Sequence, residues 1–215
     1  PSFNMPNNLV NNISNALPIF LISTFFTAPQ VGLYGLGFAM IFRPMGLVVN
    51  SMEQVFSQRI IKKYNENLPI WKEIRLLMLR SFQIGFIPFL LAGIFGPYLF
   101  RTIFGAEWEE SGRFMQLLVP WFFAAFLSNQ LTFLPDLFSK QKTYFLLNII
   151  RLVLRIGGMS VGIYLDNIYL MLGMFSLASL LIVIVTLIWY VVMLKRYEDE
   201  RKAGVVDQAQ RKRGA

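Results

Sequence analysis

Six long apolar segments, separated by polar or turn-forming residues, follow one another along the chain. They cover approximately residues 7–27, 31–58, 70–100, 114–138, 143–164 and 168–194. A helix needs roughly 18 or more mostly apolar residues to cross the hydrocarbon core of a membrane, which is about 30 Å thick. The pattern therefore predicts an all-α integral membrane protein in which residues 1–194 form a bundle of six transmembrane helices.

The connecting segments predict how this bundle is oriented. Most of the twenty Lys and Arg residues lie in the stretch 59–80, in the short loop near 140 and in the tail 195–215, whereas the other loops contain only Arg101 and Arg113. Because Lys and Arg collect in cytoplasmic loops, both termini of this segment are predicted to be cytoplasmic. The basic tail is expected to be disordered beyond its first turn, since it is rich in charge and poor in apolar residues.

Composition agrees with a membrane protein and excludes several kinds of chemistry. The 215 residues are 55% hydrophobic and 15% charged, against about 45–50% apolar and about 25% charged in soluble domains. Cys and His are both absent, which excludes disulfides, thiolate or imidazole metal ligands, a Cys nucleophile and a Ser-His-Asp triad in this chain. A net charge of +8 would indicate a nucleic-acid partner in a soluble protein, but here the excess reflects topology, and no nucleic acid is expected.

The stretch "NIIRLVLRIGG", residues 148–158, places two arginines four positions apart in an apolar segment. With about 100° between successive residues of a helix, Asn148, Arg151 and Arg155 lie on one face. With a rise of about 1.5 Å per residue, Arg155 is about 18 Å from the cytoplasmic end of its segment, near the middle of the bilayer. Arg151 lies one turn nearer to the cytoplasm.

Two other segments carry polar residues on one face. In the second predicted helix, Arg43, Asn50 and Gln54 share a sector, and Arg43 is about 17 Å from the nearer end. In the first predicted helix, one face carries several asparagines, including Asn15. The candidate substrate-binding residues are therefore Asn15, Arg43, Asn50, Gln54, Asn148, Arg151 and Arg155.

Three arginines near the middle of the bilayer are costly, at roughly 2.5–3.5 kcal/mol each on insertion scales. One interpretation is a buried salt bridge, but the available carboxylates, Glu53 and Asp136, lie toward the cytoplasmic ends of their segments. The other interpretation, which we favour, is an aqueous cavity that accepts an anion, and the arginine fork suits phosphate. Glu53 and Asp136 are either carriers of a coupling proton or sodium ion or ordinary interfacial carboxylates.

Short motifs in the first two segments and in two later stretches resemble a known family of membrane proteins. In the first two segments the matching features are Leu17-Pro18, Val31-Gly32-Leu33-Tyr34, Arg43-Pro44 and Gln54-Val55-Phe56. Further on, "LFRTIFGAEWEESGRFMQLLVPW" resembles the family's outer loop and "SKQKTYFLLNIIRLVLRI" resembles the segment entering its penultimate helix pair. The family is that of the Wzx-type polysaccharide flippases, in the multidrug/oligosaccharidyl-lipid/polysaccharide exporter superfamily, and the likeness is to its carboxy-terminal half.

This resemblance implies one half of a twelve- or fourteen-helix fold, with the amino-terminal half of the same transporter as a partner. The resemblance implies a protein that moves undecaprenyl-pyrophosphate-linked oligosaccharide repeat units across the bacterial or archaeal cytoplasmic membrane by alternating access. These units serve the biosynthesis of O-antigen, lipopolysaccharide or exopolysaccharide. Arg43, Arg151 and Arg155 would then bind the pyrophosphate or acidic sugars. The other implied partners are membrane lipids, a polysaccharide polymerase and a chain-length regulator, and no cofactor is implied apart from a coupling proton or sodium ion.

Two other functions remain as alternatives. A membrane enzyme of the same pathway, such as a polymerase, ligase or lipid phosphatase, needs an acid/base pair or a metal cluster near the bilayer surface. The glutamates of "GAEWEESG" are adjacent rather than convergent, and large loops are absent. A multidrug exporter of the same superfamily would present an acidic cavity to cationic drugs, whereas this face is basic. The sequence therefore favours a transporter, not an enzyme.

Overall fold

The computed structural model describes the backbone of residues 4–213, which is almost entirely helical and contains no strand. The elements are α1 (Asn4–Phe25), α2 (Ala28–Asn65), α3 (Trp71–Phe104), a 3₁₀ turn (Ala106–Trp108), α4 (Glu109–Asn129), α5 (Leu134–Leu137), α6 (Gln141–Tyr164) and α7 (Ile168–Arg213). Five helical stretches are long and apolar enough to cross a membrane: Ala28–Asn65, Trp71–Phe104, Ala106–Leu137, Gln141–Tyr164 and Ile168–Ala203. The chain is therefore an all-α, multi-pass membrane protein.

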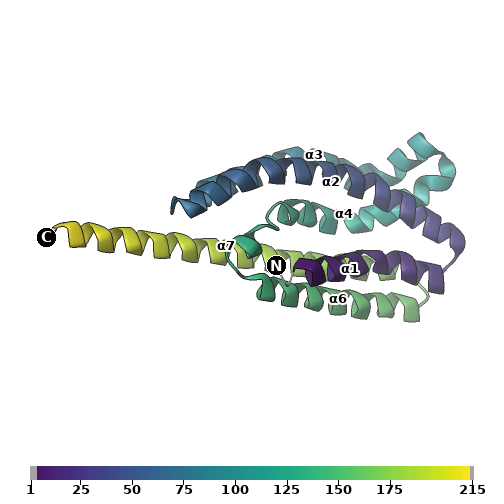
Figure 1. The fold of residues 1–215 in the computed structure, drawn as a ribbon. Coiled ribbons are helices and arrows are strands. Elements are labelled where there is room, and N and C mark those ends of the chain that lie inside the picture. The colour runs from purple at the N-terminus through teal and green to yellow at the C-terminus, as the bar shows by residue number, and fades with distance from the viewer. Residues whose placement is uncertain (1–3, 214–215) are drawn as a thin grey trace.

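α1 differs from the other predicted spans in its polarity. It has 22 residues, and six asparagines in its sequence keep its hydropathy below that of the five apolar stretches. A helix of this length measures about 33 Å, enough to cross the hydrocarbon core. Figure 1 shows α1 running alongside α6, so its polar face has a protein neighbour.

The long helices run beside one another, and their connections gather at two ends of the molecule (Figure 1). The turns after α1, α3 and α6 lie at one end. The amino-terminal end of α1, the loop at 66–70 and the turns around α5 lie toward the other end, from which α7 projects (Figure 1). The Lys- and Arg-rich connections therefore share one end of the bundle.

α4 is the central helix of the bundle. Its apolar side chains recur every four residues, and Phe114, Leu118, Phe122 and Phe126 are all at most 2% exposed. α2, α3 and α7 pack around it (Figure 1). Because lipid tails are as apolar as these side chains, close packing rather than the hydrophobic effect has to hold such helices together.

Glycines allow two pairs of helices to approach closely. Gly96 of α3 faces Gly112 of α4: a Cβ at Gly112 would lie 2.5 Å from Cα of Pro97, and a Cβ at Gly96 would lie 2.9 Å from the carbonyl oxygen of Gly112. Gly162 of α6 likewise lies against the backbone of Met171 in α7. Small residues at such crossings bring backbones into contact and increase dispersion attraction.

The predicted helix 114–138 is interrupted in the structure. α4 ends at Asn129, residues 130–133 form turns, and α5 is a separate helix of four residues. Pro135 lies at the start of α5, where its missing N–H is harmless, whereas in a continuous helix it would remove a hydrogen bond. Gln130 is fully buried in the turn, and its Nε2 donates to the carbonyl of α4 residue Phe126 at 3.3 Å.

The charged tail is helical as far as Arg213, where the sequence pattern led us to expect disorder beyond its first turn. α7 continues past Leu194 to Arg213. The carboxylate of Glu198 accepts hydrogen bonds from the backbone N–H groups of Ile70 (2.8 Å) and Trp71 (3.1 Å) at the start of α3. A carboxylate in this position satisfies helix-terminal donors and complements the helix dipole. Since the partners are more than 120 residues apart, no local pattern predicts the contact.

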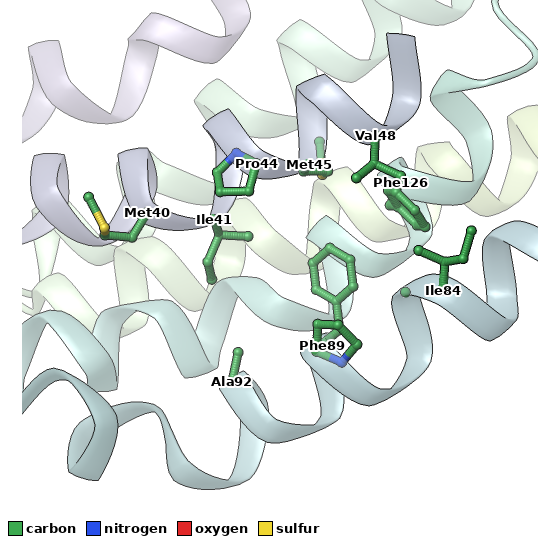
Figure 2. A pocket seen from close by; sticks show the side chains of 11 residues that line it. Met40, Ile41, Pro44, Met45, Val48, Ile84, Phe89, Ala92 and Phe126 are labelled. Atoms are coloured by element: carbon green, nitrogen blue, oxygen red, sulfur yellow. The ribbon is translucent and has the colours of Figure 1, made fainter. Parts of the chain in front are cut away.

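An apolar cavity of about 300 Å³ opens between α2, α3 and α4. Figure 2 shows Pro44 of α2 facing Phe89 of α3, with Phe126 of α4 nearby. Pro88 of α3 also lines the cavity, so both of these helices have an interior proline where they border it. Such prolines favour bends, and α2 and α3 curve together in Figure 1.

Gly112→Ala is expected to lower the free energy of unfolding by about 1–3 kcal/mol, because the new methyl group would meet the α3 backbone. Gly157→Ala is the matched control, since a Cβ at Gly157 meets nothing within 4 Å; this change should be neutral or stabilise by up to about 1 kcal/mol. Thermal unfolding of the detergent-solubilised protein measures both. Equal midpoints for the two variants would contradict the close α3–α4 contact.

Glu198→Ala is expected to expose the start of α3 to solvent. Loss of a capping group costs about 0.5–2 kcal/mol, so amide hydrogen exchange at Ile70 and Trp71 should become about tenfold faster. Asp199→Ala is the control, because Asp199 is exposed and lies on the next position of the same helix. Amide hydrogen exchange is measured by mass spectrometry. An unchanged exchange rate in Glu198→Ala would show that the hydrogen bonds from Ile70 and Trp71 to Glu198 do not stabilise the start of α3.

Candidate functional site

Arg155 lies at the middle of α6 and is completely buried, with 0% of the residue exposed. Its guanidinium donates from Nε to Oγ of Ser179 (2.7 Å) and from Nη1 to Oγ of Ser14 (2.7 Å) and Oδ1 of Asn15 (3.1 Å). The backbone carbonyl of Ser14 also accepts from Nη1, at 3.1 Å. Side chains of α1, α6 and α7 therefore meet at this one charge.

Two aromatic rings enclose the same guanidinium. Its Cζ lies 4.9 Å from the ring centroid of Trp121 in α4 and 4.5 Å from that of Phe175 in α7. Contacts of this kind stabilise a desolvated cation by about 2 kcal/mol. Within the described residues, neither Arg155 nor Arg151 forms an ion pair with a carboxylate. The structure therefore shows no buried salt bridge of the kind that the sequence left open, and neutral groups surround the charges.

Asparagines of α1 hold the second arginine. Nη2 of Arg151 donates to the amide oxygens of Asn11 and, at 2.8 Å, of Asn148. Nδ2 of Asn148 in turn donates to Oδ1 of Asn7 at 3.0 Å. Asn7, Asn11 and Asn15 are four residues apart and lie on one face of α1; we call them the asparagine ladder. This face meets the face of α6 that carries both arginines.

A cavity of about 380 Å³ lies between α1, α2, α4 and α6, and both arginines line it. Its polar lining residues are Asn11, Asn15, Asn50, Glu53, Asn129, Thr132, Tyr144, Arg151 and Arg155; we call it the arginine cavity. A second cavity of about 350 Å³, bordered by α5 residues, adjoins it and shares Asn11, Glu53, Thr132 and Tyr144. Polar surface therefore extends from the middle of the bundle toward the end where α5 lies.

The structure brings most of the predicted binding residues together. Asn15, Asn50, Arg151 and Arg155 all line the arginine cavity. Asn148 is buried and does not line it, but it positions Arg151 through a hydrogen bond. The sequence identified this set because each member is a polar residue on an otherwise apolar helix.

Two predicted residues of α2 are not part of this lining. Arg43 and Gln54 are exposed, and neither borders the arginine cavity. The face of α2 that lines the cavity is centred near Phe42 and Glu53. At about 100° per residue, Arg43 and Gln54 point about 90–110° away from that centre and lie just beyond its edge. The sequence analysis grouped Arg43, Asn50 and Gln54 because they share one sector of the helix. The cavity borders only part of that sector, so sharing it does not ensure that a residue lines the cavity.

The two predicted coupling carboxylates occupy different places. Glu53 lines both cavities, and its carboxylate accepts a hydrogen bond from the Thr132 hydroxyl at 3.2 Å. Asp136 is exposed and borders the second cavity. Glu53 therefore shares a cavity with the arginines, although the sequence placed it at a shallower depth, because the cavity extends along the helices. Among the described residues, no group of three or more Asp, Glu, His or Cys is placed to hold a metal ion.

The groups that enclose Arg155 were missed by the sequence reasoning. Ser14 and Ser179 are both buried in apolar stretches, so isolated small polar residues were the available signal. Trp121 and Phe175 belong to apolar helices that are rich in aromatic residues, and nothing local distinguishes them. Only the packing of α4 and α7 against α6 brings these two rings to the guanidinium.

The electrostatics of the arginine cavity favour an anionic ligand. Two guanidiniums one turn apart repel each other, and this repulsion is strong away from bulk water. Amide, hydroxyl and aromatic groups solvate these charges without cancelling them. Nη2 of Arg155 and Nε of Arg151 are buried and have no partner among the described residues. An anion in the cavity would relieve the repulsion, and side-chain rearrangement that opened these buried donors would let its oxygens accept from them.

Comparison with known proteins gives no match: no family model matches the chain, and neither a curated protein nor a solved structure matches it. Any function has therefore to be argued from the residues of the chain itself.

Proposed function

We propose that this chain forms one half of a flippase that moves undecaprenyl-pyrophosphate-linked oligosaccharide repeat units across the cytoplasmic membrane, for surface polysaccharide biosynthesis. The observation that carries the proposal is the pair Arg151 and Arg155, two cations held by neutral groups on the wall of a cavity in the middle of the bundle. The motifs that resemble Wzx-type flippases support it from the sequence. Such a protein binds and releases its cargo without a chemical step.

A pyrophosphate group suits the arginine cavity in charge and in size. It carries at least two negative charges, and its oxygens can accept from planar guanidinium forks. The cavity volume of about 380 Å³ lies at the small end of the range for ligand pockets, about 300–1,000 Å³. It would hold the diphosphate and an adjoining sugar, whereas a complete repeat unit would extend beyond it. The amides of Asn50 and Asn129 are available there for sugar hydroxyls.

The exposed edge of α2 would face the amino-terminal half of the transporter. Arg43 and Gln54 lie on this edge, beside the α2 face that lines the arginine cavity. We assign them to a rim that the other half would cover. Arg43 would there meet an acidic sugar or the outer part of the cargo, which keeps it in the binding path without direct contact with Arg155.

α1 would be the sixth membrane span in this proposal. Its asparagine ladder contacts the cationic face of α6, and polar side chains within a membrane are tolerated where they face the protein interior. The Lys- and Arg-rich end of the bundle would lie in the cytoplasm of a bacterial or archaeal cell, with both ends of this segment on that side.

Alternating access requires the central site to open to each side in turn. α2 and α3 are suited to bending, because each has an interior proline, Pro44 and Pro88, that lines the apolar cavity between them. Glu53 would couple a proton or a sodium ion to this motion, since it lines the arginine cavity, accepts a hydrogen bond from the Thr132 hydroxyl and forms no ion pair with a described residue.

Arg155→Ala in the complete protein is expected to reduce surface polysaccharide at least tenfold in a strain that lacks the native protein, because the deepest cation of the site is lost. Arg155→Lys should restore part of the activity, since it retains a point charge but not the bidentate fork. Arg43→Ala, at the rim, is also expected to reduce display. Immunodetection of surface polysaccharide and of membrane protein levels measures these effects.

Arg101→Ala is the matched control. Arg101 is exposed, pairs with Glu109, and lies at the end of the bundle opposite the Lys- and Arg-rich connections. It should leave display unchanged. Arg155→Met separates packing from charge, since it fills similar space without a cation. If Arg155→Met accumulates in the membrane and displays normal polysaccharide, the cationic site does not bind the cargo and the proposal fails.

A further inference from the structure

A third cavity, of about 390 Å³, lies where the end of α2 and the middle of α7 meet the turn after α5. It shares no lining residue with the arginine cavity or with the cavity that adjoins it. We call it the tail cavity, because α7 enters its charged tail there. Its position and lining are independent of the transport proposal.

Three mutually packed aromatic rings form one wall of the tail cavity. The ring of Tyr64 in α2 lies 5.2 Å from that of Phe138 and 5.1 Å from that of Tyr197 in α7, and Phe138 lies 5.6 Å from Tyr197. The Tyr197 hydroxyl also donates to the backbone carbonyl of Leu68 at 3.2 Å. Rings from three separate elements thus fix one another, which makes this wall a built feature of the fold and not a gap between mobile side chains.

The cavity has a cationic side and an apolar side. Lys140 and Arg196 line it and are exposed, and their side chains form no hydrogen bond or ion pair with the described residues. Glu200 is the carboxylate of the lining, so one net positive charge remains. Val192 and Met193 supply apolar surface on α7. A ligand that fits both sides has an anionic group joined to a hydrocarbon part.

The location of the cavity along α7 matches the membrane boundary. Its α7 lining runs from Trp189 to Glu200, about 16 Å along the helix axis. The first charged residue of α7 is Lys195, so one half of the cavity lies beside the apolar run and the other half beside the charged tail. The headgroup layer of one leaflet is about 5–8 Å thick, and Trp and Tyr concentrate at this depth.

We propose that the tail cavity binds an anionic phospholipid from the surrounding leaflet. The phosphate would lie between Lys140 and Arg196, and an acyl chain would follow Val192 and Met193 toward the membrane core. Basic pockets between spanning helices are suited to anionic headgroups. A free phosphate would leave the apolar side without a partner, and a zwitterionic lipid would leave the positive charge uncompensated. Bound lipid would join α2, the turn after α5 and α7 near the place where Glu198 accepts hydrogen bonds from the start of α3.

The test compares lipid binding by the purified protein and two double variants, using native mass spectrometry and thermal unfolding in detergent. Each basic group near an anionic headgroup contributes about fivefold in affinity, so Lys140→Gln with Arg196→Gln should weaken phosphatidylglycerol binding about 30-fold. The matched control is Lys62→Gln with Lys195→Gln, which removes the same charge from exposed positions outside the cavity. The control should bind within about twofold of the unmodified protein.

Phosphatidylglycerol should also raise the unfolding midpoint of the unmodified protein and of the control, but not that of the cavity variant. Phosphatidylcholine tests whether the negative charge is required, and glycerol phosphate tests whether the acyl chains are required. Both are expected to bind at least tenfold more weakly than phosphatidylglycerol. An equal loss of phosphatidylglycerol affinity in the two double variants would show general attraction to a basic surface. That result would contradict a lipid site in the tail cavity. Equal binding of phosphatidylcholine, or equal binding of glycerol phosphate, would overturn the assignment to an anionic lipid.

Discussion

The burial of Arg155 without a carboxylate partner is the constraint on which the centre of the bundle depends. A cation in the middle of a membrane helix costs several kcal/mol unless polar groups surround it. Here α1 supplies Ser14 and Asn15, α7 supplies Ser179 and Phe175, and α4 supplies Trp121. Four helices have to keep a fixed relation to one another for these contacts to form, so a single charge specifies much of the packing.

The same constraint explains why a polar α1 belongs to an otherwise apolar bundle. An asparagine facing lipid would leave its amide unsatisfied, but each member of the asparagine ladder accepts a hydrogen bond from α6. Arg151 and Arg155 gain neutral partners in return, and some of their donors remain unpaired. A core with every donor satisfied would be more stable, and the unpaired donors fit the anion-binding role proposed for this cavity.

Packing is uneven around this centre. Glycine contacts bring α3 against α4 and α6 against α7 at backbone distance, while an apolar cavity and interior prolines lie where α2 and α3 border α4 (Figure 2). In the proposed alternating access, the pairs joined by glycine contacts would move as units and the interior prolines would allow α2 and α3 to bend. At the tail cavity, tilted and edge-on aromatic contacts hold α7 to the end of α2, and Glu198 holds it to the start of α3. That end of the bundle is therefore fixed by side chains rather than by glycine contacts.

The sequence by itself determined the helical class, the collection of basic loops at one end and the polar face of α6. It also predicted six spans, of which the structure shows five to be long and apolar enough to cross a membrane. These follow from local periodicity and composition, which depend only on neighbouring residues. It also identified Arg151, Arg155, Asn15 and Asn50 as members of one site, because polar residues in apolar helices are conspicuous. Only the tertiary structure decided which neutral groups enclose Arg155, that Arg43 and Gln54 lie at an edge, that Glu53 shares the cavity, and that the tail continues as a helix. Each of these depends on contacts between helices that are far apart in the chain. Helix periodicity predicts the direction in which a side chain points, but not which residue of another helix it contacts.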